Sequence, residues 1–176
     1  MRLSGLFAPP DAVEVIPGLH LGAAPSRRAA RALTWSGVSY AIDLRTGGVR
    51  GSPWPESVQT FSCPLAEYEA PAPATLRAIS RQIAALIAYG EIVYVHCRAG
   101  VQRAPTVACA VLMQMGWRLP DAFRLVGSRR SVAALSETQL KALKRTGATP
   151  VVARDPESPA CVVEPISSFG PWLSAS

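Results

Sequence analysis

The sequence predicts one α/β domain with a mostly parallel central sheet flanked by helices. Segments typical of strands alternate along the chain with segments typical of helices, which is the pattern of α/β proteins. The segment 92–95 is apolar throughout and of strand length, as expected for a strand buried on both faces of a parallel sheet. A chain of 176 residues, of which 49% are hydrophobic and 17% charged, fits a single globular domain.

The predicted strands are short apolar runs bounded by glycine, proline or polar residues. They comprise residues 13–16 and 19–22 around a Pro17-Gly18 turn, 38–44, 61–65 and 92–95. The predicted helices carry apolar residues at helical spacing. They comprise residues 26–36, 75–89, 103–116, 121–126 and 137–146. Ser26 and Ser136 stand where helix caps are expected, and Gln139 completes a capping box with Ser136.

Three regions are expected along the chain. Residues 1–12 are predicted to be a loosely ordered leader, 13–146 the domain, and 147–176, with proline, serine and glycine, a weakly ordered tail. The apolar run 104–115 is shorter than the roughly 20 helical residues that span a bilayer. Pro9 and Pro10 interrupt the N-terminus before any core of a signal peptide develops. We therefore expect no membrane span and a cytoplasmic protein.

The charges and cysteines argue against several classes of protein. The net charge of +6 is carried almost entirely by arginine, whose side chain suits bidentate binding of phosphate. The arginines form no basic run, so nucleic acid is an unlikely partner. The four cysteines show no CxxC spacing, which argues against a zinc site and a disulfide framework. We expect free thiols and no metal or organic cofactor.

The residues that carry chemistry lie in the segment 93–105. It reads as a buried strand, a short loop that begins with Cys97 and ends with Arg103, and a helix. Such a loop directs backbone N–H groups into one concavity, where the helix dipole adds positive potential. An oxyanion such as phosphate fits there, and the same field stabilises a thiolate. We therefore predict that Cys97 is the nucleophile and Arg103 a bidentate clamp on phosphate, while Gly100 permits close approach of the backbone.

The motif His96-Cys97-x-x-Gly100-x-x-Arg103 resembles the signature of the cysteine-dependent protein tyrosine phosphatases. The order of elements over residues 13–146 is similar to that of their dual-specificity branch, and Arg103-Ala104-Pro105 is similar to the phosphatases of regenerating liver. The resemblance implies a fold like that of the dual-specificity phosphatases. It also implies a phosphate-binding loop that comprises Arg98, Ala99, Gly100, Val101, Gln102 and Arg103. His96 is expected to support this loop and the thiolate through hydrogen bonds.

Two positions depart from the pattern of this family. Ala104 stands where most members have serine or threonine, whose hydroxyl assists hydrolysis of the phosphocysteine, so a slow second step is expected. The general acid of the family is an aspartate on an earlier loop, but residues 64–69 contain no aspartate here. Alignment on Pro64 places Glu67 in the position of the acid, with Glu69 as the alternative.

These observations predict a phosphatase that hydrolyses phosphate monoesters through a phosphocysteine intermediate. The expected partners are phosphorylated substrates, among them phosphotyrosine and also phosphoserine or phosphothreonine proteins. Arg98 is a candidate for substrate contact, and Trp54 and Tyr68 for an aromatic rim. Three alternatives stay open: a pseudophosphatase that binds phosphorylated partners without turnover, a phosphoinositide or nucleotide phosphatase, and a sulfur-transfer or redox protein that uses Cys97.

Overall fold

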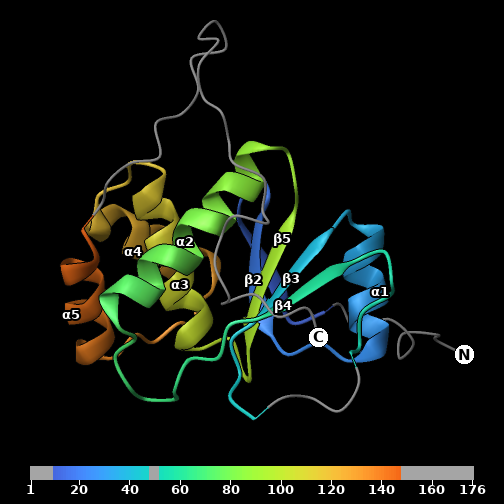
Figure 1. Cartoon of the computed structure of the whole chain (residues 1–176), viewed down its shortest axis with the longest axis horizontal. Coiled ribbons are helices and arrows are strands. Elements are labelled where there is room, and N and C mark those ends of the chain that lie inside the picture. The colour runs from blue at the N-terminus through green and yellow to red at the C-terminus, as the bar shows by residue number, and fades with distance from the viewer. Residues whose placement is uncertain (1–9, 48–51, 148–176) are drawn as a thin grey trace, which may run out of the picture.

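The computed structural model describes residues 10–47 and 52–147, and these form a sheet of five strands with helices on both faces (Figure 1). In sheet order the strands are β1 (Ala12–Ile16), β2 (Leu19–Ala23), β5 (Val93–Cys97), β3 (Tyr40–Asp43) and β4 (Gln59–Ser62). Strands β2, β5, β3 and β4 run parallel, and β1 pairs antiparallel with β2 at one edge. The predicted α/β class with a mostly parallel sheet is confirmed.

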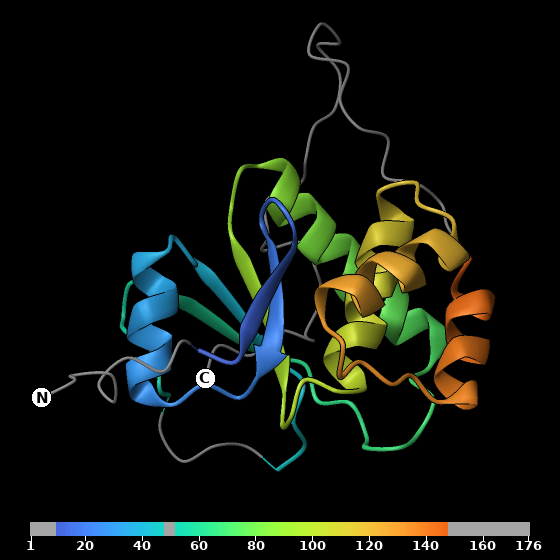
Figure 2. The same cartoon turned by 180° about the vertical axis from the view of Figure 1, so that it is seen from behind.

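The helices are divided unequally between the two faces of the sheet. One helix, α1 (Arg27–Trp35), lies on one face, and the others gather on the opposite face (Figures 1 and 2). Those are α2 (Pro73–Ala88), α3 (Arg103–Gln114), α4 (Leu119–Arg129) and α5 (Glu137–Thr146). Within the described ranges, no helix combines the length and the apolar character that crossing a membrane requires.

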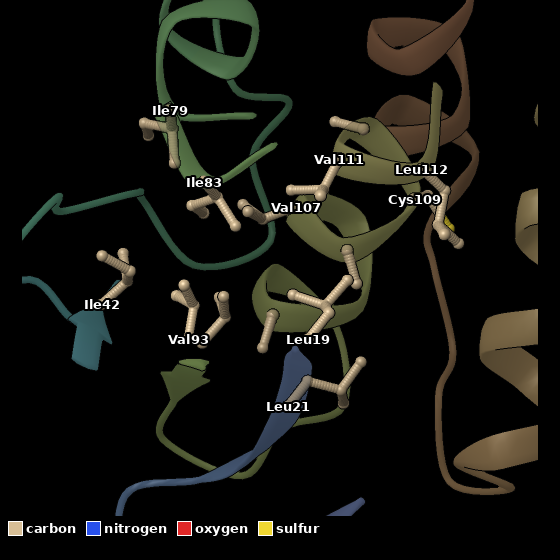
Figure 3. Packing of buried hydrophobic residues seen from close by; sticks show 14 of the residues in the cluster. Leu19, Leu21, Ile42, Ile79, Ile83, Val93, Val107, Cys109, Val111 and Leu112 are labelled. Atoms are coloured by element: carbon tan, nitrogen blue, oxygen red, sulfur yellow. The ribbon is translucent and has the colours of Figure 1, made fainter. Parts of the chain in front are cut away.

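The main core lies between the sheet and the larger group of helices. Ile83 of α2, Val107 of α3 and Val93 of β5 are buried there and belong to one cluster (Figure 3). Helix α3 is buried at every residue because it packs against β2, β5 and three neighbouring helices. Burial on all sides fixes the start of α3 against the end of β5, which is where the predicted site lies.

Several element boundaries differ from those predicted. Strand β4 ends at Ser62 and not at residue 65, and β3 spans four residues and not the predicted 38–44. Strand β5 continues past Val95 to Cys97, because His96 and Cys97 still pair with Asp43 and Ala23 of the neighbouring strands. Polar residues at a strand end weaken the apolar pattern without ending the hydrogen-bond ladder.

The helices follow the predictions more closely, since α5 has the predicted bounds and its capping box, and Ser26 caps α1. Helix α2 begins two residues earlier than predicted, at Pro73, where the missing N–H of proline costs no hydrogen bond. Helix α4 is longer than predicted at both ends. The predicted tail beyond residue 147 and residues 1–9 of the predicted leader lie outside the described residues.

Candidate active site

The structure places Cys97 and Arg103 at the carboxyl edge of the sheet. Cys97 is the last residue of β5, and Arg103 is the first residue of α3. Both side chains are buried, whereas Arg98 and Ala99 of the intervening loop are exposed. The residues 98–102 therefore form a turn over the start of α3, with the cysteine at its base.

Every carbonyl oxygen of residues 98–102 accepts a hydrogen bond from a group outside the loop. The Ala24 N–H donates to the carbonyl oxygen of Arg98 (3.2 Å), the Ala134 N–H to that of Val101 (2.9 Å) and the Thr106 N–H to that of Gln102 (2.9 Å). The Arg130 side chain donates to the other two carbonyl oxygens, from Nη2 to Ala99 (3.0 Å) and from Nε to Gly100 (2.7 Å). Five consecutive carbonyls are thus fixed in direction by their partners.

The fixed carbonyls determine where the backbone N–H groups point. The peptide bonds of the described residues are trans, so each N–H points away from the carbonyl oxygen of the same peptide. In the part of the chain that the structure describes, no backbone N–H of residues 98–102 donates to a protein acceptor. Free donors at the start of a helix form a binding site for an anion, because N–H groups and helix dipole act together.

Gly100 is required by a close approach of two backbone segments. Its φ is +65°, and a Cβ at this position would lie 2.5 Å from the carbonyl carbon of Gly22 and 2.7 Å from Arg130 Nη2. At Gly22 a Cβ would lie 2.1 Å from the carbonyl oxygen of Asp11. Gly100 thus allows the loop to pack directly against β2, and Gly22 allows the backbone of Asp11 and the Tyr94 hydroxyl to approach β2.

Arg103 is held at the mouth of the loop by groups from two other strand ends. Its Nη1 donates to the carbonyl oxygens of Leu44 (3.3 Å) and Leu65 (3.2 Å). Its Nη2 donates to Glu67 Oε1 at 3.1 Å, and the Glu67 side chain is 42% exposed. The structure therefore brings Glu67, the predicted acid, into contact with Arg103, the residue predicted to bind phosphate.

The alternative acid is not brought to the site. Glu69 is exposed and, among the residues that the structure describes, has no hydrogen-bond or ion-pair partner. Between the two glutamates lies Tyr68, an exposed residue with a φ of +65°, a value that is uncommon for a residue with a side chain. This turn separates Glu69 from the position of Glu67.

His96 lies buried beneath the loop and is neutral at physiological pH. Burial lowers its pKa to about 4, although the nearby Asp43 carboxylate acts in the opposite direction. Its Nδ1 lies 3.7 Å from Asp43 Oδ1, and its ring stacks on Tyr94 at 5.6 Å between centroids. These contacts fix the ring next to Cys97, so the geometry favours a supporting part for His96 over proton transfer.

The expectation for Trp54 is wrong. Its side chain is 9% exposed and packs edge-on against Tyr94, with 5.6 Å between the ring centroids. It also lies near the His96 ring, at 6.4 Å, and belongs to the smaller core under α1. Trp54 therefore cannot form a rim for substrate, whereas Tyr68 remains exposed.

The end of β3 carries a charged pair beside the site. Arg45 Nε and Nη2 bind the Asp43 carboxylate at 2.6–3.1 Å. Burial alone would raise the pKa of Asp43, but these hydrogen bonds and nearby positive charge lower it below its usual range. Across residues 10–47 and 52–147, no three His, Cys, Asp or Glu side chains cluster in a way that could hold a metal ion.

Two supporting residues were not identified from the sequence. Arg130 stands after another arginine at the end of a helix, a place where a solvated side chain is the usual finding. Asp11 falls in the segment predicted as a loose leader, yet it forms an ion pair with Arg130 at 2.8 Å and directly precedes β1. No local pattern marks either residue, because their roles depend on contacts between segments distant in sequence.

Comparisons with known proteins agree with this geometry. A family model described as "Dual specificity phosphatase, catalytic domain" matches residues 19–147. The mouse "Phosphatidylglycerophosphatase and protein-tyrosine phosphatase 1" is 38% identical over 58 residues, which is 32% of this chain and 30% of that relative. This match thus spans less than a third of either protein.

Solved structures show the same architecture. Human DUSP28 has a TM-score of 0.70 and 26% identity, over 79% of this chain and 94% of that one. Tk-PTP in its active form has a TM-score of 0.70 and 24% identity, over 77% of this chain and 95% of that one.

Proposed function

The chain belongs to the dual specificity phosphatase family, and from this premise we propose that it hydrolyses phosphate monoesters with Cys97 as its nucleophile. The observation that carries the proposal is the fixed direction of the loop carbonyls. Among the described residues, the N–H groups of residues 98–102 donate to no protein acceptor, and the loop that carries them joins the buried Cys97 to the buried Arg103. Such a site binds an oxyanion and presents a sulfur atom to it.

The proposed reaction has two steps. The Cys97 thiolate attacks phosphorus as the bond to the leaving oxygen breaks, and the proton of the Glu67 carboxyl passes to that oxygen. The loop N–H groups and Arg103 stabilise the charge on the equatorial oxygens. Water then attacks the phosphocysteine, gives its proton to the Glu67 carboxylate, and releases phosphate and the thiolate.

The contact between Glu67 and Arg103 implies that phosphate binds to the loop before Glu67 acts as the acid. In the described structure the Glu67 carboxylate occupies Arg103 Nη2 at 3.1 Å, the position of an anionic ligand. A phosphate on the loop competes for the same donor, so its binding would release Glu67, which then takes up from solvent the proton that it passes to the leaving oxygen. Binding of the substrate would thereby free Glu67 for proton transfer.

Hydrolysis of para-nitrophenyl phosphate tests the proposal. Wild type is expected to release nitrophenol, and Cys97→Ser to lose the activity, because a serine hydroxyl is far less ionised than the thiol. Cys109→Ala is the matched control, since Cys109 is a buried cysteine of α3 among small apolar residues. Activity that persists in Cys97→Ser would refute the nucleophile.

A pseudophosphatase is the second candidate, and Ala104 favours it. Ala104 is fully buried beside the loop and places no hydroxyl there to assist the second step. A protein that binds inorganic phosphate with no release of nitrophenol from the ester would have this function. A sulfur-transfer protein would instead turn over thiosulfate, and would do so after Arg103→Ala.

The class of substrate follows from a panel of phosphorylated compounds. We propose phosphotyrosine peptides as the first substrates, with phosphoserine and phosphothreonine peptides next. The name of the mouse relative justifies including phosphatidylglycerophosphate, and phosphoinositides are included as the alternative that the sequence leaves open. The ratio of kcat/KM between peptide and lipid esters decides between the two classes.

A further inference from the structure

We propose that Asp11 is a positioning residue for the phosphate site, acting through Arg130. This inference rests on the proposed function of the 98–103 loop and goes beyond it in assigning a role to a residue ahead of the domain. The family model matches from residue 19, so Asp11 lies outside the matched region. No other part of the described chain supplies a carboxylate to the guanidinium of Arg130.

Arg130 connects the loop to the rest of the molecule. Its side chain is 4% exposed, which is a rare degree of burial for an arginine. Its Nε donates to the carbonyl oxygen of Gly100 at 2.7 Å, and its Nη2 donates to that of Ala99 at 3.0 Å. One side of the planar guanidinium thus holds two adjacent peptides of the loop.

Asp11 binds the other side of the same guanidinium. Its Oδ1 accepts from Arg130 Nη1 at 2.8 Å and its Oδ2 accepts from Nη2 at 3.1 Å. These hydrogen bonds are the largest cause of a lowered pKa for the Asp11 carboxyl. The backbone of Asp11 is fixed as well, because its carbonyl oxygen accepts from the Ala23 N–H at 3.1 Å. The carboxylate is therefore held in one place, and it fixes the plane of the guanidinium.

The plane of the guanidinium sets the direction of two loop N–H groups. The carbonyl of Ala99 shares its peptide with the N–H of Gly100, and the carbonyl of Gly100 shares its peptide with the N–H of Val101. If Arg130 turns, these carbonyls lose their donors and the two N–H groups are no longer directed toward a bound anion. Asp11 thus acts on phosphate from behind the loop, without touching it.

The experiment compares Asp11→Ala with Asp121→Ala in the full chain. Asp121 is the matched control, because it forms an exposed ion pair with Arg124 at 3.0 Å on α4, the helix that Arg130 follows. The measurements are the affinity for inorganic phosphate by calorimetry, KM and kcat for para-nitrophenyl phosphate, and the melting temperature. We expect Asp11→Ala to weaken phosphate binding about tenfold and to raise KM by a similar factor. Asp121→Ala should match wild type in both.

A conservative variant separates positioning from mere stability. Because Arg130 is 4% exposed, the loss of Asp11 should lower the melting temperature more than the loss of Asp121 does, so phosphate affinity and KM are measured well below both melting temperatures. Asp11→Glu keeps the negative charge and should retain most of the phosphate affinity of wild type. Arg130→Lys should behave like Asp11→Ala, because a lysine cannot donate to two carbonyl oxygens and a carboxylate at the same time. A melting temperature that falls while phosphate affinity and KM stay at wild-type values would overturn the proposal.

The result also remains separable from the proposed function. If wild type binds phosphate but does not hydrolyse the ester, the catalytic proposal fails, and the change in phosphate affinity still tests Asp11. If Asp11→Ala binds phosphate as tightly as wild type does, the role of Asp11 is refuted, whatever the turnover. If wild type binds no phosphate, both proposals are refuted.

Discussion

Two loops meet at Arg103, and they are held in different ways. In the loop of residues 98–102, all five carbonyls accept hydrogen bonds, and a buried arginine supports it from behind. The loop that follows β4 is exposed from residue 66 to residue 70, and Glu67 reaches the site through its contact with Arg103. The loop that binds the anion is thus preorganised. Glu67, which delivers the proton, is instead held by Arg103, a residue that the substrate itself would bind.

The largest effect is expected on the fixed side of this comparison, at Arg103. Arg103→Lys should lower kcat for para-nitrophenyl phosphate by about 10³-fold, because lysine lacks the planar fork that stabilises the transition state. Arg81→Lys is the matched control, since Arg81 is an exposed arginine of α2 outside the loop. An Arg103→Lys variant with more than a tenth of wild-type kcat would show that the clamp is unimportant.

His96, beneath the same loop, should make stability depend on pH. The unfolded chain takes up a proton on His96 near its ordinary pKa of 6.5, whereas the folded chain does so near 4. The unfolded state therefore binds more protons between these values, and the free energy of unfolding should fall by up to about 3 kcal/mol as the pH drops through this window. Urea denaturation at several pH values measures the slope.

A variant isolates the contribution of His96 from that of the carboxylates. His96→Gln removes the titrating group, so its free energy of unfolding should depend less steeply on pH between 6.5 and 4. Equal slopes in the two proteins would show that His96 takes up its proton equally in the folded and unfolded states.

On the exposed side of the comparison, Glu67→Gln should separate proton delivery from binding. We expect kcat to fall about 10²-fold, since glutamine cannot protonate the leaving oxygen. The affinity for inorganic phosphate should rise, because a neutral side chain competes less well for Arg103 Nη2. Glu69→Gln is the control and should match wild type; if it shows the loss of kcat instead, the acid is Glu69.

The smallest effect is expected at Ala104, because this residue should affect only the second step, the hydrolysis of the phosphocysteine. Ala104→Ser restores a hydroxyl beside Cys97 and should speed hydrolysis of the phosphocysteine by about tenfold. Rapid-mixing experiments should show an initial burst of nitrophenol in wild type and a smaller burst in the variant. The residue is fully buried, so the melting temperature must be checked for strain from the added oxygen. A burst of equal size in both proteins would show that residue 104 does not set the rate of the second step, and the absence of a burst in wild type would exclude a slow second step.

The order of strand, loop and helix around Cys97 and Arg103 could be predicted from the sequence, whereas the contacts that surround the loop could not. Cys97, Gly100 and Arg103 lie within one short segment, so their spacing alone determines how they meet at the start of α3. Tertiary contacts set the remainder. Trp54 is a candidate for an aromatic rim from the sequence, but it packs on Tyr94 and completes the core under α1.

The support of the loop could not be predicted for the same reason. Arg130 and Asp11 are 119 positions apart, and nothing near either residue indicates that they share an ion pair. Strand ends were also misplaced where polar residues continue a ladder, as at His96, which pairs with Asp43. Local patterns report the propensity of a segment, whereas pairing between strands and burial of charge depend on the assembled fold.

Trapping the phosphocysteine tests the proposed mechanism: the protein is denatured during turnover of para-nitrophenyl phosphate, and its peptides are mapped by mass spectrometry. We expect one phosphoryl group on the peptide that contains Cys97, accumulated because Ala104 slows its hydrolysis. No such adduct is expected in Cys97→Ser. Nitrophenol release with the Cys97 peptide unmodified, or a phosphoryl group on a different residue, would contradict the central claim.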